Sequence, residues 1–295
     1  MKVLNFGSLN IDKIYCVDHI VQPGETIASS QLVTNPGGKG CNQSGAMAKA
    51  GLEVYHAGKI GEDGLFLLDS LKKCHVDVSN VLTNAPYSGQ AIIQLAHNGQ
   101  NSIVLFPGAN REITTGEIDQ VLDRFERGDA LILQNEINNI AYLIAQGSKR
   151  GLKISFNPSP FTPDLLALDL SSVDLFFINE IEAGQIIHDG LSHSYEELLS
   201  FISEKFPHAG IVLTVGKDGA YFSHGKKVWY QPIIDAPVVD TTAAGDTFMG
   251  YFIASLSKGY SPEKALYYAT KASSITVSHK GALESIPYSD EVFLA

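Results

Sequence analysis

"DALILQNEINNIAYLIAQGSKRGLKISFNPSP" runs from Asp129 to Pro160 and combines three segments of different character. Residues 129–134 form an apolar run of strand length, and residues 138–151 have the spacing of an amphipathic helix that ends at Gly151. A second strand-like run follows. Apolar strands joined by amphipathic helices are typical of a parallel sheet that is covered on both faces. This stretch therefore predicts an α/β fold.

The same alternation continues on both sides of this stretch. Residues 173–180 and 209–216 read as strands, while residues 182–190 and 195–206 read as helices. The N-terminal "MKVLNFGSLN" and the later "NQSGAMAKAGLEVYHAGKIG" follow the same pattern. We therefore expect a doubly wound, mostly parallel sheet with helices on both faces, built as one domain over residues 1–295.

Two stretches depart from this rhythm, residues 13–38 and 89–110. Both alternate apolar and polar residues with a period of two, as half-buried strands do. The second contains Asn98-Gly99, a strong hairpin signal. We expect a small β-sheet lid, with strands at about 12–35 and 89–107, that projects from the main body.

Composition excludes several classes of function. The net charge of −11 and the scattered basic residues argue against a nucleic-acid surface. The longest apolar runs have strand length, which argues against a membrane span, and no signal peptide follows Met1. Three cysteines without a CxxC pair predict neither a disulfide framework nor a zinc site. We expect a cytoplasmic protein that takes a small neutral substrate, or an anion held by backbone N–H groups and a metal ion.

Common catalytic fingerprints are absent from the sequence. It contains no GxxxxGK[ST] loop, and "GSLNID" follows the first strand in place of GxGxxG. It also lacks HExxH and GxSxG, so neither a zinc protease nor a typical hydrolase is indicated.

"DTTAAGDTFMGYF" (240–252) is the first candidate site. We interpret 238–240 as a strand, 241–245 as a turn and 246–259 as a helix, with an apolar stripe facing the sheet at Phe248, Phe252 and Leu256. Asp246 could cap this helix. Alternatively, the small residues before it could admit a phosphate, with Asp246 as general base for an attacking hydroxyl.

Two further segments carry polar side chains suited to a sugar. "GSLNID" (7–12) ends the first strand with Asn10 and Asp12 on one face, and "NPGGKGCNQ" (35–43) places Lys39 and Asn42 beside a glycine turn. Such groups could bind several hydroxyls. They could equally be strand-end caps and a solvated lysine.

The later loops indicate a nucleotide. "TVGKDG" (214–219) is a glycine loop at a strand end, and "NEIE" (179–182) could position a hydrated magnesium ion or simply cap a helix. The segment 279–287 is a loop with available carbonyls.

Together these segments resemble the ribokinase-like (PfkB-type) sugar kinase family, and within it the ribokinases. The likeness covers nearly the full length, in order, and the pair GGKGxNQ and DTxxAGDxF is highly specific. It implies a doubly wound α/β domain with a β-sheet lid, and ATP-dependent phosphorylation of a sugar hydroxyl, most closely O5 of D-ribose. It also implies a homodimer formed through the lid.

The resemblance assigns roles to particular residues. Asp246 would be the catalytic base, and the backbone N–H groups of Ala243, Ala244 and Gly245 would form the anion hole for the γ-phosphate. The sugar would be held by Asn10, Asp12, Gly38, Lys39, Asn42, Glu136 and Asp246. The nucleotide would be held by Asn179, Thr214, Gly216, Lys217, Gly219 and Gly245.

The resemblance also implies two cations, with ATP as the phosphoryl donor. Glu182 would act indirectly on Mg²⁺. A potassium site would involve Asp240, Thr242, Thr276, His279, Gly281 and Ser285. His279 replaces an arginine that is frequent in ribokinases, and Asn135 precedes Glu136 where an apolar residue is common. We expect Asn135 to lie near the sugar and to affect which furanose is preferred.

Two alternatives stay open at this point. The chain could phosphorylate another sugar or a nucleoside, such as fructose, deoxyribose or pseudouridine. It could also be a sugar-binding regulator that has lost catalysis, although such a binder has no need of a base at Asp246.

Overall fold

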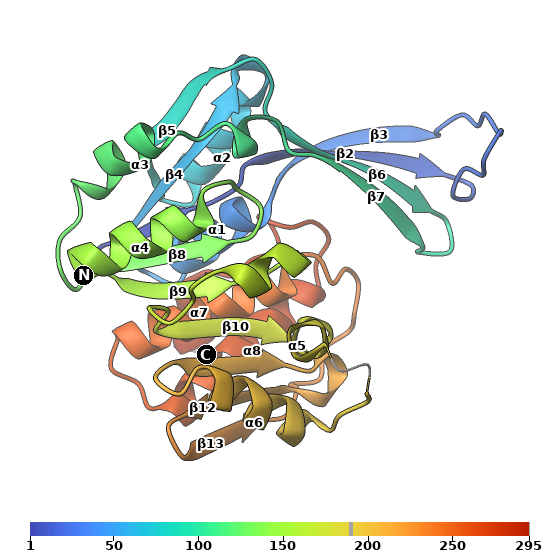
Figure 1. The fold of residues 1–295 in the computed structure, drawn as a ribbon. Coiled ribbons are helices and arrows are strands. Elements are labelled where there is room, and N and C mark those ends of the chain that lie inside the picture. Colours follow the sequence, from blue (N-terminus) through green and yellow to red (C-terminus); the bar gives the residue numbers. More distant parts are fainter. Residues whose placement is uncertain (189–190, 295) are drawn as a thin grey trace.

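The computed structural model describes residues 1–188 and 191–294, and its centre is a nine-stranded sheet (Figure 1). The spatial order is β13-β12-β11-β10-β9-β8-β1-β4-β5. The strands are β1 (Val3–Phe6), β4 (Val54–Gly61), β5 (Asp77–Ala85), β8 (Ala130–Gln134), β9 (Lys153–Asn157), β10 (Leu175–Asn179), β11 (Gly210–Thr214), β12 (Ala220–His224) and β13 (Lys227–Gln231). Pairing is parallel from β5 to β11 and antiparallel at β12 and β13.

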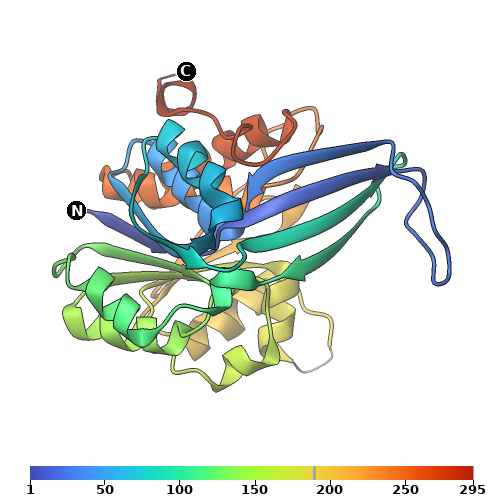
Figure 2. The same ribbon diagram turned by 90° about the horizontal axis from the view of Figure 1, so that it is seen from above.

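Helices cover both faces of this sheet, as predicted (Figure 2). One face carries α1 (Lys39–Lys49), α2 (Leu65–Lys73), α7 (Ala244–Ser257), α8 (Pro262–Val277) and α9 (Ser289–Phe293). The other carries α3 (Thr115–Leu122), α4 (Ile140–Arg150), α5 (Glu180–Ile187) and α6 (Tyr195–Lys205). Short 3-10 turns are η1 (Glu62–Gly64), η2 (Gly108–Arg111), η3 (Pro163–Ala167) and η4 (Gly216–Asp218). Two hydrophobic cores result, one on each face.

The stretch 129–160 folds as its pattern predicts. All five residues of β8 are buried, and β8 pairs in parallel with β9. Between them, α4 ends where Gly151 adopts the left-handed conformation (φ 75°) that stops helices. Of the predicted 182–190 helix, residues 182–187 lie in α5, which ends at Ile187, and residues 189–190 lie outside the described residues.

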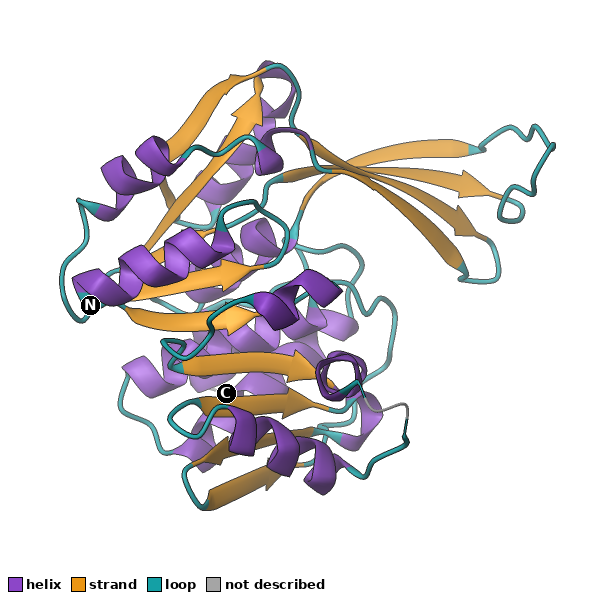
Figure 3. Cartoon of the chain, viewed as in Figure 1, coloured by secondary structure: helices purple, strands orange, loops and turns teal. Residues whose placement is uncertain are grey.

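The lid is a separate four-stranded sheet that extends away from the main body (Figure 3). Its order is β3-β2-β6-β7, from β3 (Gln31–Gly37), β2 (Asn10–Val17), β6 (Gly89–Ala96) and β7 (Asn101–Phe106). The predicted hairpin joins β6 to β7, and Gly99 supplies the positive φ of its turn (84°). Asn10 and Asp12 therefore lie on the first lid strand, where we had placed them at the end of the first sheet strand.

The segment before α7 differs from its prediction. Residues 238–240 are not a strand, because Val239 hydrogen-bonds Val277 at the end of α8 (N to O, 2.8 Å) and does not join the sheet. Helix α7 begins at Ala244, so Asp246 is its third residue and not its N-cap. The apolar stripe is confirmed where it packs most deeply: Phe248 and Phe252 are buried.

None of the helices in the described part of the chain combines the length and the hydropathy that are needed to cross a bilayer.

Candidate active site

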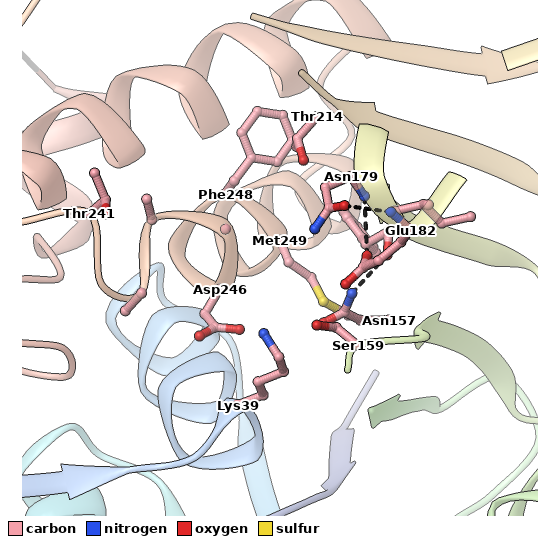
Figure 4. A pocket seen from close by; sticks show the side chains of 15 residues that line it. Lys39, Asn157, Ser159, Asn179, Glu182, Thr214, Thr241, Asp246, Phe248 and Met249 are labelled. Carbon is pink, nitrogen blue, oxygen red and sulfur yellow. Dashed lines mark hydrogen bonds between the residues drawn. The ribbon is translucent and has the colours of Figure 1, made fainter. Parts of the chain in front are cut away.

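A polar pocket of about 210 Å³ lies at the carboxyl ends of β9, β10 and β11, beside the N-termini of α1 and α7 (Figure 4). Ligands of open α/β sheets bind at this edge, because strand ends and helix N-termini converge there. Its lining includes Lys39, Asn157, Asn179, Glu182, Gly245 and Asp246. Segments far apart in the sequence thus meet in one cavity.

Asp246 is held by two amide side chains from α1. Asn42 Nδ2 donates to Asp246 Oδ2 (3.2 Å), and Gln43 Nε2 donates to Asp246 Oδ1 (2.9 Å). The carboxylate belongs to a residue that is only 8% exposed. The two helices approach closely because Gly250 of α7 faces Ala46 of α1, where a Cβ on Gly250 would lie 2.5 Å from the Ala46 Cβ. This arrangement leaves a fixed, acceptor-only carboxylate at the pocket wall.

The N-terminus of α7 offers N–H groups beside this carboxylate. Ala243 is the N-cap residue in the left-handed conformation (φ 60°), and the space beyond Gly245 Cα is open. Ala244 N–H makes a long bond to Thr241 O (3.3 Å). Within residues 1–188 and 191–294, the N–H groups of Gly245 and Asp246 have no hydrogen-bond acceptor. Among the same described residues the Ala243 N–H has no acceptor either, so the free donors include Ala243 and Gly245 of the predicted hole together with Asp246.

Lys39 is the first residue of α1, and its amine points toward the Asp246 carboxylate in Figure 4. Burial disfavours its charge, but three nearby carboxylates outweigh burial and raise the pKa of Lys39 above its ordinary value; they belong to Asp246, Glu136 and Glu182. Lys39 is therefore a charged member of the pocket and not a freely solvated side chain.

The residues predicted to hold a sugar come together beneath the lid. Glu136 Oε2 accepts hydrogen bonds from Lys39 N (2.9 Å) and from the Ser8 hydroxyl. Burial, and then the Glu136 charge, raise the pKa of Asp12 to about 7. Asn10 is buried and accepts from Asn110 Nδ2 (2.7 Å).

Two glycines make this packing possible. Gly37 lies directly under the Asp12 carboxylate, so any side chain there would collide with it. Gly38 has a positive φ (93°), which lets the chain turn from β3 into α1.

Asn179 and Glu182 form a capping box at the start of α5. Asn179 Oδ1 accepts from Glu182 N (2.8 Å), and Glu182 Oε2 accepts from Asn179 N (3.2 Å), as Figure 4 shows. The capping alternative is thus present in the structure. Both residues also line the pocket.

A second pocket of about 510 Å³, with a mostly apolar lining, adjoins the first. The predicted loop contributes Thr214, Gly216, Lys217 and Gly219 to it. The two pockets share Gly245 and Phe248, so they meet at the N-terminus of α7. The geometry can place a large, partly apolar molecule on one side of this helix end and a small polar one on the other.

The model of the pfkB family carbohydrate kinases matches residues 1–288. The chain belongs to this family. A ribokinase of Staphylococcus aureus (strain COL) is 33% identical over 303 residues, which cover 99% of this chain and 98% of that protein.

Solved structures are similar to this carbohydrate kinase fold over nearly its whole length. The ribokinase of Cryptococcus neoformans in complex with ADP is 34% identical, with a TM-score of 0.83 over 99% of this chain and 98% of that one. The ribokinase of Arabidopsis thaliana complexed with ribose and ATP is 28% identical, with a TM-score of 0.85 over 99% and 97%.

In this family member the predicted potassium loops are joined by Asp240. Its Oδ1 accepts from Thr242 N (2.9 Å) and Thr242 Oγ1 (2.6 Å), and its Oδ2 accepts from Gly281 N (3.0 Å). Burial would raise the pKa of Asp240, but these bonds outweigh burial and lower it.

The other side chains of the predicted potassium set have protein partners. Thr276 Oγ1 donates to Thr247 Oγ1 (3.1 Å), His279 Nδ1 lies 2.9 Å from Ile275 O, and Ser285 Oγ donates to Ala282 O (2.8 Å). A monovalent cation would therefore be held mainly by main-chain oxygens, a donor set that suits it.

No cluster of three or more His, Cys, Asp or Glu among the described residues is arranged to hold a metal ion. Mg²⁺ fits this pocket only in the way it usually binds with nucleotides, through phosphate oxygens, water and one carboxylate. Glu182, like Asp246, is a buried carboxylate residue in the lining of the polar pocket.

The Asn135 amide is hydrogen-bonded within the protein, and its place near the sugar stays a prediction. Its Nδ2 donates to Pro160 O (2.7 Å) and Thr162 Oγ1 (3.1 Å), so its amide is occupied by the loop after β9. Sequence reasoning missed Gln43, which touches Asp246, and residues 233–238, which wall the second pocket. The only signal for Gln43 in the sequence was its position next to Asn42, because the sequence does not show which group a buried amide will hydrogen-bond.

Proposed function

We propose that this chain is an ATP-dependent sugar kinase that transfers the γ-phosphoryl group to O5 of D-ribose. The observation that carries the proposal is the position of Asp246. It is fixed by Asn42 and Gln43 near the N-terminus of α7, in the wall of the small polar pocket and next to Gly245, which lines both pockets. The ribokinases to which the chain is similar support ribose as the sugar.

Phosphoryl transfer depends mainly on positioning and on stabilising charge. The Asp246 carboxylate accepts the proton of the attacking sugar hydroxyl. The N–H groups of residues 243–246 and the positive end of the α7 dipole hold the γ-phosphate in line with that hydroxyl. The Lys39 ammonium adds positive charge on the side of the sugar.

The remaining site residues form two groups, one that binds the sugar and one that binds the nucleotide. The sugar hydroxyls are bound by Asn10, Asp12, Gly38, Lys39, Asn42 and Glu136. The nucleotide is bound by Asn179, Thr214, Gly216, Lys217, Gly219 and Gly245. Glu182 would lie near Mg²⁺ bound with ATP, which would supply charge neutralisation of the phosphates. The loops around Asp240 and Gly281 would hold K⁺ next to the turn that precedes α7.

A substrate panel tests the proposal. ADP release is measured with ribose, 2-deoxyribose, fructose, tagatose and nucleosides, and ribose should give the highest kcat/KM. Faster turnover of another member would reassign the substrate. Ribose binding without ADP release would instead support a non-catalytic regulator.

The Asp246→Asn variant tests the base. Asparagine keeps the size but cannot take the proton, so kcat should fall by about 10²–10⁴-fold. Asp123→Asn, at an exposed carboxylate paired with Arg150, is the matched control and should keep full activity. Similar turnover in wild type and Asp246→Asn would remove Asp246 as the base.

We further propose that the kinase is one domain with its lid, that it is cytoplasmic, and that it dimerises through the lid. The three cysteines are free, which suits a reducing compartment. On β7, the consecutive residues Ile103, Val104, Leu105 and Phe106 are 47–62% exposed, an unusual run on a soluble surface. Sedimentation should give a dimer, and Val104→Lys with Phe106→Lys should give a monomer.

A further inference from the structure

A chain of buried amide side chains leads from Asp246 into the protein. Gln43 Nε2 donates to Asp246 Oδ1 (2.9 Å), and Gln43 Oε1 accepts from Gln134 Nε2 (2.6 Å). Gln134 Nε2 also donates to Asn5 Oδ1 (2.9 Å). The three amide residues are at most 1% exposed, so water does not compete for these bonds.

This chain fixes the orientation of the Gln43 amide. Because Gln134 presents an N–H group, Gln43 must direct its oxygen toward Gln134 and its N–H group toward Asp246. Asn5 is anchored in turn, since its Nδ2 donates to Gly40 O and to Ser44 Oγ (2.8 Å each). A donor held in this way favours the ionised form of a carboxylate, because the hydrogen bond stabilises the charged oxygen. The same Gln43 Nε2 also donates to Asn157 Oδ1 (3.2 Å).

We propose that Gln43, held by Gln134 and Asn5, is a positioning residue that keeps the Asp246 carboxylate ionised and in one orientation for the sugar hydroxyl. The proposal rests on the function proposed above. Asn42 also donates to Asp246, but it is assigned to the sugar. Gln43 is not among the side chains that line the polar pocket, so it acts through Asp246 and not on the substrate.

The charged and titratable groups around this carboxylate come from α1 and α5. Lys39 of α1 favours the ionised form, whereas Glu182 of α5 opposes it from across the pocket. Cys41 of α1 is neutral, because burial raises the pKa of its thiol far above the ordinary range. None of these charged groups changes in a Gln43 variant, which removes only the hydrogen bonds of the Gln43 amide to Asp246, Asn157 and Gln134.

The test compares Gln43→Met with Ser44→Ala, its neighbour on the same helix. Gln43→Met keeps the volume and removes the donor. Ser44→Ala also loses buried hydrogen bonds, to Asn5 and His56, but Asn5 stays bound to Gly40 O and Gln43 is untouched. Protonation of Asp246 is followed by carboxyl NMR of aspartate-labelled protein, with Asp246→Asn used to assign the resonance.

For Gln43→Met, the pH at which Asp246 is half protonated should rise by about one to two units, the usual worth of a hydrogen bond to a charged group. The acidic limb of the kcat profile should move with it. At neutral pH, kcat should fall about tenfold while both KM values stay within about threefold, because substrate contacts are kept. Gln43→Glu should shift the midpoint further, since two touching carboxylates share a proton.

Ser44→Ala should lower thermal stability without moving the titration. An unchanged midpoint in both Gln43 variants, or an equal shift in Ser44→Ala, would overturn the proposal. If the wild type phosphorylates no sugar but the titration midpoint of Asp246 moves in the Gln43 variants, the proposed function fails and the proposed role of Gln43 stands. If the wild type phosphorylates ribose and the titration midpoint of Asp246 does not move in the Gln43 variants, only the proposed role of Gln43 fails.

Discussion

Sugar affinity should depend on the protonation of Asp12. Its carboxylate packs over Gly37 on the lid, and burial followed by the charge of Glu136 raises the pKa of Asp12 to about 7. A sugar hydroxyl donates its hydrogen to a carboxylate, so binding requires the ionised form. About half of the Asp12 side chains are ionised at pH 7 and about one in ten at pH 6. The apparent Kd for ribose should therefore be about tenfold weaker at pH 6 than at pH 8.

Calorimetric titration with ribose, without nucleotide, between pH 5.5 and 8.5 measures this dependence. Asp12→Asn should bind more weakly but with a nearly constant Kd, because the titrating group is gone. The KM for ATP serves as internal control and should not follow the same curve. A wild-type Kd that stays within about twofold over this range would refute the assignment of a raised pKa to Asp12.

The raised pKa of Asp12 should also make the free energy of unfolding depend on pH. Because the folded pKa of Asp12 is raised, the folded state binds more protons than the unfolded state between about pH 4 and 7. The contribution of Asp12 to the free energy of unfolding therefore falls as pH rises through that window, by at most about 4 kcal/mol. The free energy of unfolding of Asp12→Asn minus that of the wild type, measured in urea, should therefore rise with pH over the same window, and a difference that is independent of pH would again contradict it.

Another buried group acts in the opposite direction and has to be separated from Asp12. Burial lowers the pKa of His56 to about 4, so its contribution is present above about pH 6.5 and is lost as pH falls toward 4. The two slopes partly cancel in the wild type. For this reason the difference between variant and wild type, and not the wild-type curve, is the informative quantity.

Three further substitutions probe the packing that supports the site, each by its free energy of unfolding in denaturant. Gly40→Ala should cost about 1–3 kcal/mol, because its Cβ would lie 2.7 Å from the Gly7 Cα, and a neutral result would show that the backbone yields there. Phe252→Ala should cost about 3–5 kcal/mol, since the ring is fully buried against two aromatic rings of β10 and β12; a cost below 1 kcal/mol would contradict this packing. Lys49→Met should cost about 2–4 kcal/mol, because its buried ammonium donates to two carbonyls of the loop after α8 (2.8 Å each), and an unchanged stability would mean that water replaces it.

Much of the architecture followed from local patterns. Apolar runs such as 130–134 and the amphipathic spacing of 140–150 depend on neighbours only a few residues away, so strands, helices and the stop at Gly151 could be predicted. The lid followed from two-residue alternation and from the turn at Asn98-Gly99 in the same way. The failure at 238–240 has the converse cause: Val238 and Val239 have the composition of a strand, but the N–H of Val239 bonds to the end of α8.

The candidate site was predictable only in part, because its residues come from distant segments. Asp12 lies near Glu136 only because the lid strand passes the end of β8, and no local sequence pattern predicts that contact. Adjacency to Glu136 likewise did not reveal that the loop after β9 accepts hydrogen bonds from the Asn135 amide.

The sequence by itself determined that an α/β sugar kinase of this family was present and which carboxylate, Asp246, opens the helix beside a turn of small residues. Those properties reside in segment composition and in motif spacing. Only the tertiary structure decided that Asp246 is the third residue of α7 and not its cap, and that the amides of Asn42 and Gln43 hold it. The physical reason is that a hydrogen bond between residues about two hundred positions apart exists only once close packing of α1 on α7 has brought the two helices together.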